Sequence, residues 1–220
     1  MKRSVGMIHV LPENVMIFGR LAGELVPGVE VQHFLDTSLP TMSAPASRPE
    51  VINRLQTYAS FASRSGSEAV LLTCTAFGRL VEEVSSAVDC PVLSVLEIMV
   101  DEALKQHGRI GIVGSHPCTV AGAERLVRER ATQEGRALEV EARHCPGAFD
   151  AMRNGDWETH DRVVLENLRE LVQRVDVVVA PQASLERAIV RFKDARHRVP
   201  ILTSSRLSVA RLRDTVERLD

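Results

Sequence analysis

The stretch that decides the fold is residues 69–78, which read Ala69-Val70-Leu71-Leu72-Thr73-Cys74-Thr75-Ala76-Phe77-Gly78. The apolar first half predicts a buried strand, and the small residues after Cys74 predict a tight loop that leads into a helix from Arg79. In open α/β sheets, ligands bind beyond the carboxyl ends of the strands, where this cysteine falls. A helix N-terminus offers backbone N–H groups to an anion and favours the thiolate form of a nearby cysteine. We therefore expect a reactive sulfur with a pKa below about 8.5 beside a carboxylate-binding loop; a buried structural cysteine is the alternative.

The composition is that of an ordinary globular protein, with 220 residues of which 45% are hydrophobic and 25% charged. The formal net charge of −2 predicts neither a nucleic-acid-binding nor a membrane-binding surface. No segment approaches the ~20 apolar residues that span a bilayer, and the N-terminus lacks the pattern of a signal peptide. The four cysteines form no CxxC pair, which is typical of a reduced cytoplasmic protein and not of a disulfide framework or a zinc site.

Strand-like and helix-like segments alternate along the chain. The predicted strands are residues 4–10, 29–35, 69–73, 92–95, 109–114, 138–143, 176–180 and 199–202. The predicted helices between and after them are residues 14–25, 50–65, 79–87, 96–105, 120–134, 159–175, 185–192 and 208–219. Strands that alternate with helices predict an α/β fold with parallel sheets and crossover helices.

The second half of the chain repeats the first. The ends of the predicted strands pair as His9 with Gly114, Asp36 with His144, Cys74 with Gln182, and Ser94 with Thr203. The offsets are 105, 108, 108 and 109 residues by subtraction, and their near constancy predicts two copies of one unit. We therefore predict two pseudo-symmetric lobes, residues 1–97 plus 206–220 and residues 98–205, with the site in the cleft that the lobes share.

The loops at the predicted strand ends are small and rich in hydroxyl groups, which suits close backbone approach to a compact anion. The predicted substrate-binding residues are His9, Thr73, Thr75, Ala76, Ser115, Thr119, Gln182, Ala183 and Ser184. For His9 the alternative is a hydrogen-bonding structural role. The chain has no GxxxxGK[ST], no GxGxxG after the first strand and no HExxH, so it predicts no nucleotide cofactor and no metal.

Several segments, in this order along the chain, resemble the aspartate/glutamate/hydantoin racemase superfamily, which includes maleate isomerase and arylmalonate decarboxylase. They are residues 71–76, Glu97 and residues 110–115, 178–185 and 199–202. The resemblance implies two flavodoxin-like lobes with the site between them, no cofactor, a small carboxylate substrate and a homo-oligomer. In the racemases, one cysteine from each lobe acts. One takes a proton from the carbon next to the carboxylate, and the other returns a proton to the opposite face.

This sequence departs from that pattern in the second lobe. Cys74 matches the first catalytic cysteine, but Gln182 stands at the second position, and an amide neither takes nor gives a proton usefully near neutral pH. Either Cys118, His116 or Cys145 supplies the second acid, or the chemistry is one-sided. We predict a cofactor-independent racemase or isomerase with Cys74, Cys118 and His116 as catalytic residues. The alternatives are a decarboxylase or lyase with one catalytic cysteine, and a non-catalytic protein that binds a small acid.

Overall fold

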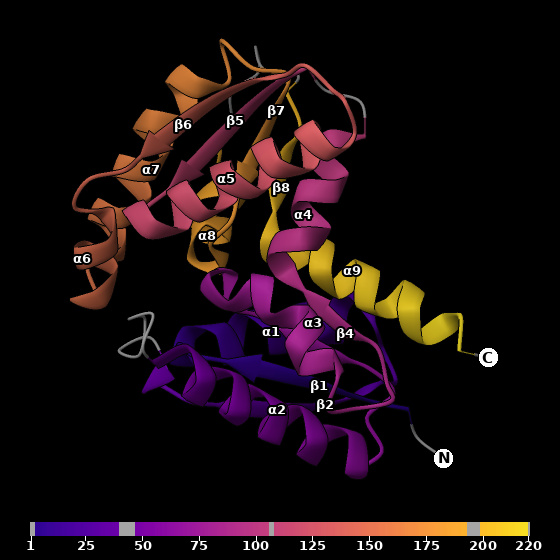
Figure 1. Ribbon diagram of the computed structural model, residues 1–220. Helices are drawn as coiled ribbons and strands as arrows, with labels where there is room; N and C mark the ends of the chain where they lie inside the picture. Colours follow the sequence, from indigo (N-terminus) through magenta and orange to yellow (C-terminus); the bar gives the residue numbers. More distant parts are fainter. Residues whose placement is uncertain (1–2, 40–46, 106–107, 193–198, 220) are drawn as a thin grey trace. The chain divides into compact units, whose positions relative to one another are not determined.

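The computed structural model describes residues 3–39, 47–105, 108–192 and 199–219 (Figure 1). The chain divides into two compact units. Unit 1 comprises Met1–Ile98 and Ser205–Asp220, and unit 2 comprises Met99–Ser204. Each unit has its own parallel four-stranded sheet. No helix in the described ranges is long and apolar enough to cross a membrane.

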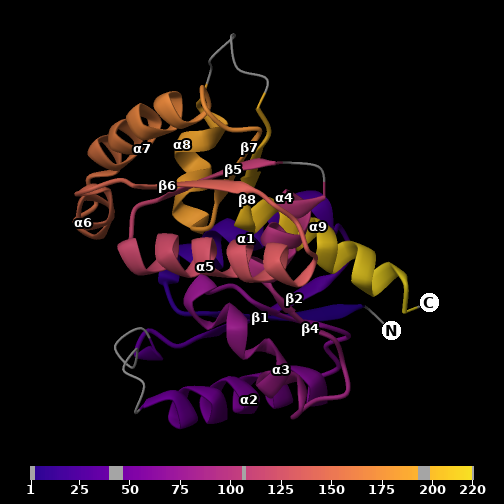
Figure 2. The same ribbon diagram turned by 45° about the horizontal axis from the view of Figure 1, so that its top comes forward.

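Unit 1 is built on a sheet with the strand order β2-β1-β3-β4. Its strands are β1 (Ser4–His9), β2 (Glu30–Leu35), β3 (Val70–Leu72) and β4 (Val92–Ser94). Its helices are α1 (Pro12–Leu25), α2 (Arg48–Arg64), η3 (Thr75–Leu80), α3 (Val81–Ser85), the start of α4 (Val95–Leu104) and α9 (Ser204–Glu217). The helices α2 and α3 lie side by side (Figure 2), joined by a hydrogen bond of 2.8 Å from Gln56 Nε2 to the carbonyl of Glu83.

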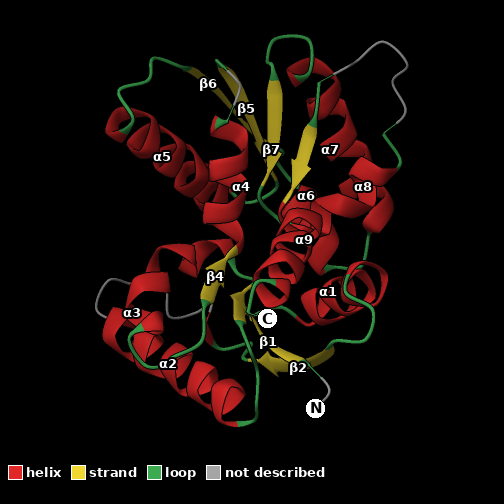
Figure 3. Cartoon of the chain, turned by 90° about the vertical axis from the view of Figure 1, so that its right-hand side faces the viewer, coloured by secondary structure: helices red, strands yellow, loops and turns green. Residues whose placement is uncertain are grey.

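Unit 2 has the matching strand order β6-β5-β7-β8. Its strands are β5 (Arg109–Gly114), β6 (Glu139–His144), β7 (Val177–Ala180) and β8 (Ile201–Thr203). Its helices are α5 (Pro117–Gln133), α6 (Ala148–Arg153), α7 (Trp157–Leu171), η4 (Ala183–Leu185) and α8 (Glu186–Val190). Figure 3 shows α5 and α7 on opposite sides of this sheet, which explains why β7 is buried along its whole length.

The two sheets share the same register as well as the same strand order. Gly6 on β1 pairs with Val70, and Gly111 on β5 pairs with Val178. A Cβ added at Gly6 would lie 2.6 Å from Ala62 Cβ, and one at Gly111 would lie 2.9 Å from Leu171 Cγ, so each glycine allows a helix to approach the central strand closely. The predicted α/β fold with two parallel sheets is therefore confirmed.

The hydrogen bonds correct one pair in the predicted repeat. The amide of Asp36 donates to His9 O at 3.0 Å, and the amide of Cys145 donates to Gly114 O at 2.8 Å. Asp36 therefore matches Cys145, and the predicted match with His144 is wrong by one residue. The cause is that β2 ends at Leu35 and β6 at His144, so the two strands end at equivalent positions one residue before Asp36 and Cys145.

Candidate active site

Cys74 lies at the carboxyl end of β3, in a central position of the unit 1 sheet. Its backbone is extended, with φ −97° and ψ 118°, and it caps the short 3₁₀ helix η3. The amide of Phe77 closes the turn by donating to the carbonyl of Cys74 at 3.2 Å. Of the two neighbours predicted to bind a carboxylate, Thr75 is half-buried and Ala76 is exposed. The sulfur therefore stands at the strand-end position where open α/β sheets bind ligands.

The protonation state of Cys74 differs from the prediction. Burial raises the pKa of the Cys74 thiol to about 11, and the backbone amides of Ala76 and Phe77, which favour the thiolate, offset only part of this effect. The predicted pKa below about 8.5 is therefore wrong. The physical reason is that Cys74 packs against the apolar core of unit 1, and two amides of a short turn do not compensate for the lost hydration. At neutral pH this residue is a thiol, which can give a proton directly.

His9 is fully buried, and both of its ring nitrogens have partners inside unit 1. Thr73 Oγ donates to the carbonyl of Ile8 at 2.8 Å and lies 2.9 Å from His9 Nδ1, so Nδ1 carries the hydrogen and Thr73 Oγ accepts it. His9 Nε2 lies 2.8 Å from His33 Nδ1, which therefore donates to it. Burial and the neighbouring His33 lower the pKa of His9 to about 3, so the ring is neutral. This arrangement favours the structural role for His9 and fixes Thr73, the residue before Cys74.

Gln182 occupies the position in unit 2 that Cys74 occupies in unit 1. The amide of Leu185 donates to Gln182 O at 3.1 Å, which reproduces the turn between Phe77 and Cys74. Both polar atoms of the Gln182 carboxamide form hydrogen bonds. Its Oε1 accepts from the amides of Ser115 at 2.7 Å and His116 at 3.2 Å, and its Nε2 donates to Ser115 Oγ at 2.9 Å. The offset of 108 residues predicted from the sequence therefore matches equivalent backbone positions.

Two of the four unit 2 amides that were predicted to bind a carboxylate already have an acceptor within the chain. Ser115 N–H has Gln182 as its acceptor, and Thr119 N–H donates to the carbonyl of His116 at 3.1 Å. Ala183 and Ser184 are buried in η4. The binding roles of these four residues stay predictions, and a ligand at Ser115 would have to replace the carboxamide of Gln182.

The sequence offers three residues as the second acid, and their surroundings in the structure differ. Cys145 is completely buried in the apolar core of unit 2, where burial raises the pKa of its thiol to about 12. Cys118 is exposed in the first turn of α5. His116 caps the same helix, and its ring meets Phe149 edge-on, with the ring centroids 4.8 Å apart. Cys118 and His116 therefore remain candidates, while Cys145 belongs to the core.

Asp36, the residue after β2, is a carboxylate with several hydrogen-bond partners. It accepts from Ser38 Oγ at 2.6 Å and Tyr58 OH at 2.7 Å, and it pairs with Arg54 at 2.6 Å. Burial alone would raise the pKa of Asp36, but these hydrogen bonds and the Arg54 charge together hold it below its usual range. The carboxylate is thus used to fix the residues after β2. In the described ranges, no three His, Cys, Asp or Glu side chains gather as a metal site requires.

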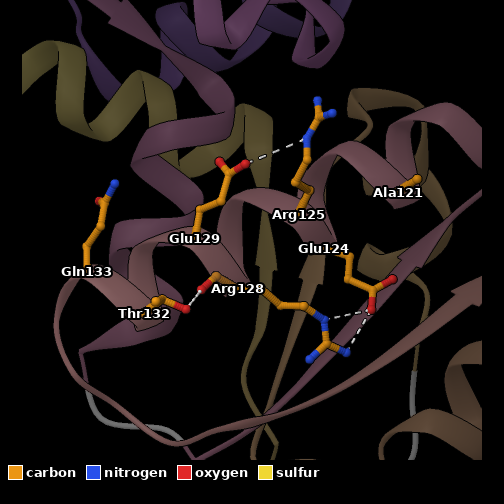
Figure 4. Close-up of a pocket in the computed structure, with 7 residues that line it drawn as sticks. All are labelled: Ala121, Glu124, Arg125, Arg128, Glu129, Thr132 and Gln133. Carbon is orange, nitrogen blue, oxygen red and sulfur yellow. Dashed lines mark hydrogen bonds and ion pairs between the residues drawn. The ribbon is translucent and has the colours of Figure 1, made fainter.

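A shallow depression of about 600 Å³ lies on the outer face of α5 (Figure 4). It is lined by Ala121, Glu124, Arg125, Arg128, Glu129, Thr132 and Gln133. Arg128 pairs with Glu124 at 2.8 Å and Arg125 with Glu129 at 4.0 Å, so its charges are paired along the helix. None of the predicted site residues lines this depression.

Comparisons with known proteins agree with the fold. The chain matches, over residues 37–212, the family model described as Asp/Glu/Hydantoin racemase. Its structure is similar to a glutamate racemase from Francisella tularensis in complex with D-glutamate, with a TM-score of 0.75 and 14% identity over 99% of this chain and 82% of that one. It is also similar to an aspartate racemase homologue from Pyrococcus horikoshii, with a TM-score of 0.73 and 16% identity over 99% and 100%.

A third similar structure is an allantoin racemase from Klebsiella pneumoniae, with a TM-score of 0.69 and 14% identity over 99% of this chain and 88% of that one. At these identities the likeness concerns the fold. No curated protein matches the sequence.

Proposed function

Because the chain belongs to the Asp/Glu/hydantoin racemase family, we propose that it is a cofactor-independent enzyme in which Cys74 transfers a proton next to the carboxylate of a small acid. The observation that supports this most directly is the position of Cys74. It follows a central strand, caps a helical turn and has the amides of Ala76 and Phe77 beside its sulfur. A thiol can serve as a general acid or base there without a metal.

As a racemase or isomerase, the enzyme would use Cys74 first as a base. Since burial keeps its pKa at about 11, the thiol has to release its proton to solvent water before its thiolate can take one from the substrate. As the substrate proton leaves, the carboxylate gains enediolate character, and the amides of Thr75 and Ala76 would stabilise that charge. Cys118 or His116 would then return a proton to the opposite face of the carbon.

Two observations favour a second candidate function, which is decarboxylation or a related lyase reaction with one catalytic cysteine. Gln182 replaces the second thiol and is held by three hydrogen bonds. In addition, Cys74 is protonated at neutral pH because of its burial, as a proton donor must be. In such a reaction carbon dioxide leaves first, the electron pair stays on the carbon, and the Cys74 S–H proton is transferred to it. This sequence requires only one acid.

A panel of small acids incubated with the protein in D₂O and followed by NMR distinguishes these functions. Racemisation exchanges deuterium into the carbon next to the carboxylate, decarboxylation releases carbon dioxide, and isomerisation converts a cis double bond to trans. Cys74→Ser should lose the reaction. Cys90→Ser is the matched control, because Cys90 is a half-buried cysteine that precedes a strand of the same unit. If none of the acids reacts but one of them perturbs the Cys74 loop, the non-catalytic acid-binding alternative is correct.

A further inference from the structure

The carboxamide of Gln182 lies among backbone and side-chain groups that could also bind a small ligand. Its oxygen accepts from two successive backbone amides, Ser115 at 2.7 Å and His116 at 3.2 Å. Its nitrogen donates to Ser115 Oγ at 2.9 Å, and Ser115 is itself almost fully buried. Two converging N–H groups and a hydroxyl are a donor set that suits a carboxylate, because the hydroxyl can turn and donate as well.

The backbone around this side chain leaves room for it. A Cβ added at Gly114 would lie 3.0 Å from Gln182 Oε1 and 2.6 Å from Val120 Cγ2. Any larger residue at the end of β5 would therefore compete with the carboxamide for space. The matching position in unit 1 carries His9, which reaches across to Thr73. Thus unit 2 has a small residue on β5 and a long side chain after β7, and the two fit each other.

We propose that Gln182 is a specificity-determining residue whose carboxamide takes the place of a carboxylate at the amides of Ser115 and His116. While Gln182 is in place, unit 2 does not accept a free carboxylate there. Recognition of the substrate acid, if the proposed function holds, is then left to the Cys74 loop of unit 1. Gln182 thus does more than stand in place of a second cysteine. Its carboxamide also occupies the two backbone N–H donors that could bind a carboxylate.

Truncation to alanine gives a direct test, because Gln182→Ala removes four heavy atoms, Cγ, Cδ, Oε1 and Nε2. Acetate and acetamide have the same number and connectivity of heavy atoms, so either can refill the space. We would follow the amide signals of Ser115 and His116 by ¹⁵N NMR while titrating acetate. In Gln182→Ala we expect a saturable shift at these two amides, and acetamide should compete for the same position.

The control is a second glutamine truncated in the same way. Gln56 Nε2 donates to the carbonyl of Glu83 at 2.8 Å, so Gln56→Ala exposes an acceptor and should not bind acetate. Wild type and Gln182→Glu, which keeps an acceptor at the amides, should also show no saturable shift. A folded Gln182→Ala that does not respond to acetate, or a wild-type protein that responds equally, overturns the proposal.

A measurement on the wild-type protein covers the case in which Gln182→Ala does not fold. The Ser115 and His116 amides should exchange with D₂O more slowly than unbonded amides, since the carboxamide oxygen accepts from both. Exchange at the random-coil rate would show that Gln182 does not occupy this position. These readouts involve no turnover, so a failed activity assay and a failed occupancy test are distinguishable.

Discussion

The loop after β3 and the loop after β7 have the same backbone turn, yet one carries a sulfur and the other a carboxamide. In both, an amide three residues on donates to the carbonyl of the first residue, at 3.2 Å in the Cys74 loop and 3.1 Å in the Gln182 loop. On the strands that lead into these loops, the amides of Val70 and Val178 donate to the carbonyls of Pro91 and Pro200, both at 2.9 Å. Main-chain bonds therefore preserve the repeat while side chains at one position diverge.

The divergence extends to the neighbouring strand. In unit 1, His9 at the end of β1 reaches across to Thr73 after β3. In unit 2 the direction is reversed, because Gln182 after β7 reaches back to Ser115 after β5. Each unit thus links the ends of its two central strands by a polar side chain, but from opposite strands. This leaves the thiol of Cys74 outside the hydrogen bonds that link the strands of unit 1, while the equivalent side chain in unit 2 is itself the link.

The largest expected effect comes from removing the sulfur. Cys74→Ser is nearly isosteric and should fold normally, but it should lose on the order of 10²–10⁴-fold in turnover, the usual contribution of a general acid or base. Steady-state kinetics on an acid that reacts in the D₂O panel provide the measurement, with circular dichroism as the check on folding. Turnover that survives in Cys74→Ser and disappears in Cys118→Ala would assign the chemistry to α5.

The second prediction concerns how the thiols react with iodoacetamide as a function of pH. Only the thiolate is alkylated, and a pKa of about 11 leaves on the order of one Cys74 in 10⁴ ionised at pH 7. Raising the pH towards 11 increases the thiolate fraction, so the rate at Cys74 should rise about tenfold for each pH unit. Peptide mass spectrometry should find the exposed Cys118 modified first and the buried Cys145 last. Fast modification of Cys74 at pH 7 would contradict the effect of burial.

The architecture could be predicted from the sequence because hydrophobic periodicity and turn residues are local properties, and because the repeat offset needs only the positions of the predicted strand ends. Pairing Cys74 with Gln182 needed only the strand ends. The pKa predicted for Cys74 was too low because the burial of its thiol depends on residues distant in sequence, such as Leu55 and Val84, which pack in the same core. The hydrogen bonds of Gln182 were also missed, since its partner Ser115 lies 67 residues away in the chain. No local pattern indicates which side chain reaches which loop.

The third prediction compares the matched glycines of the two sheets. Gly6→Ala should destabilise the protein by about 1–3 kcal/mol, because the new methyl meets Ala62 Cβ at 2.6 Å and neither group can rotate away. Gly111→Ala should cost less, since its nearest neighbours are side-chain atoms of Leu171 and Val175, which can move. Urea unfolding measures both.

Gly122→Ala in α5 is the control for these two variants. Nothing lies within 4 Å of the added methyl, so the change should stabilise by about 0.5–1 kcal/mol through helix propensity alone. Equal losses of stability at Gly6 and Gly111 would mean that the two helix–sheet contacts are equally rigid.

The smallest expected effect is the loss of one hydrogen bond between strand ends, and it compares the Gln182–Ser115 contact of unit 2 with the His9–Thr73 contact of unit 1. Ser115→Ala removes only the acceptor of Gln182 Nε2, and Gln182 is half-buried, so water can replace part of the lost bond. We expect a loss of about 0.5–1.5 kcal/mol in the free energy of unfolding. Thr73→Val should cost more, about 1–3 kcal/mol, because it leaves Nδ1 of the fully buried His9 without its acceptor. The carbonyl of Ile8 loses the Thr73 hydroxyl but keeps the backbone amide of residue 73 at 3.1 Å. If Ser115→Ala were the more damaging change, the carboxamide link of unit 2 would hold its strand ends more firmly than the imidazole link of unit 1.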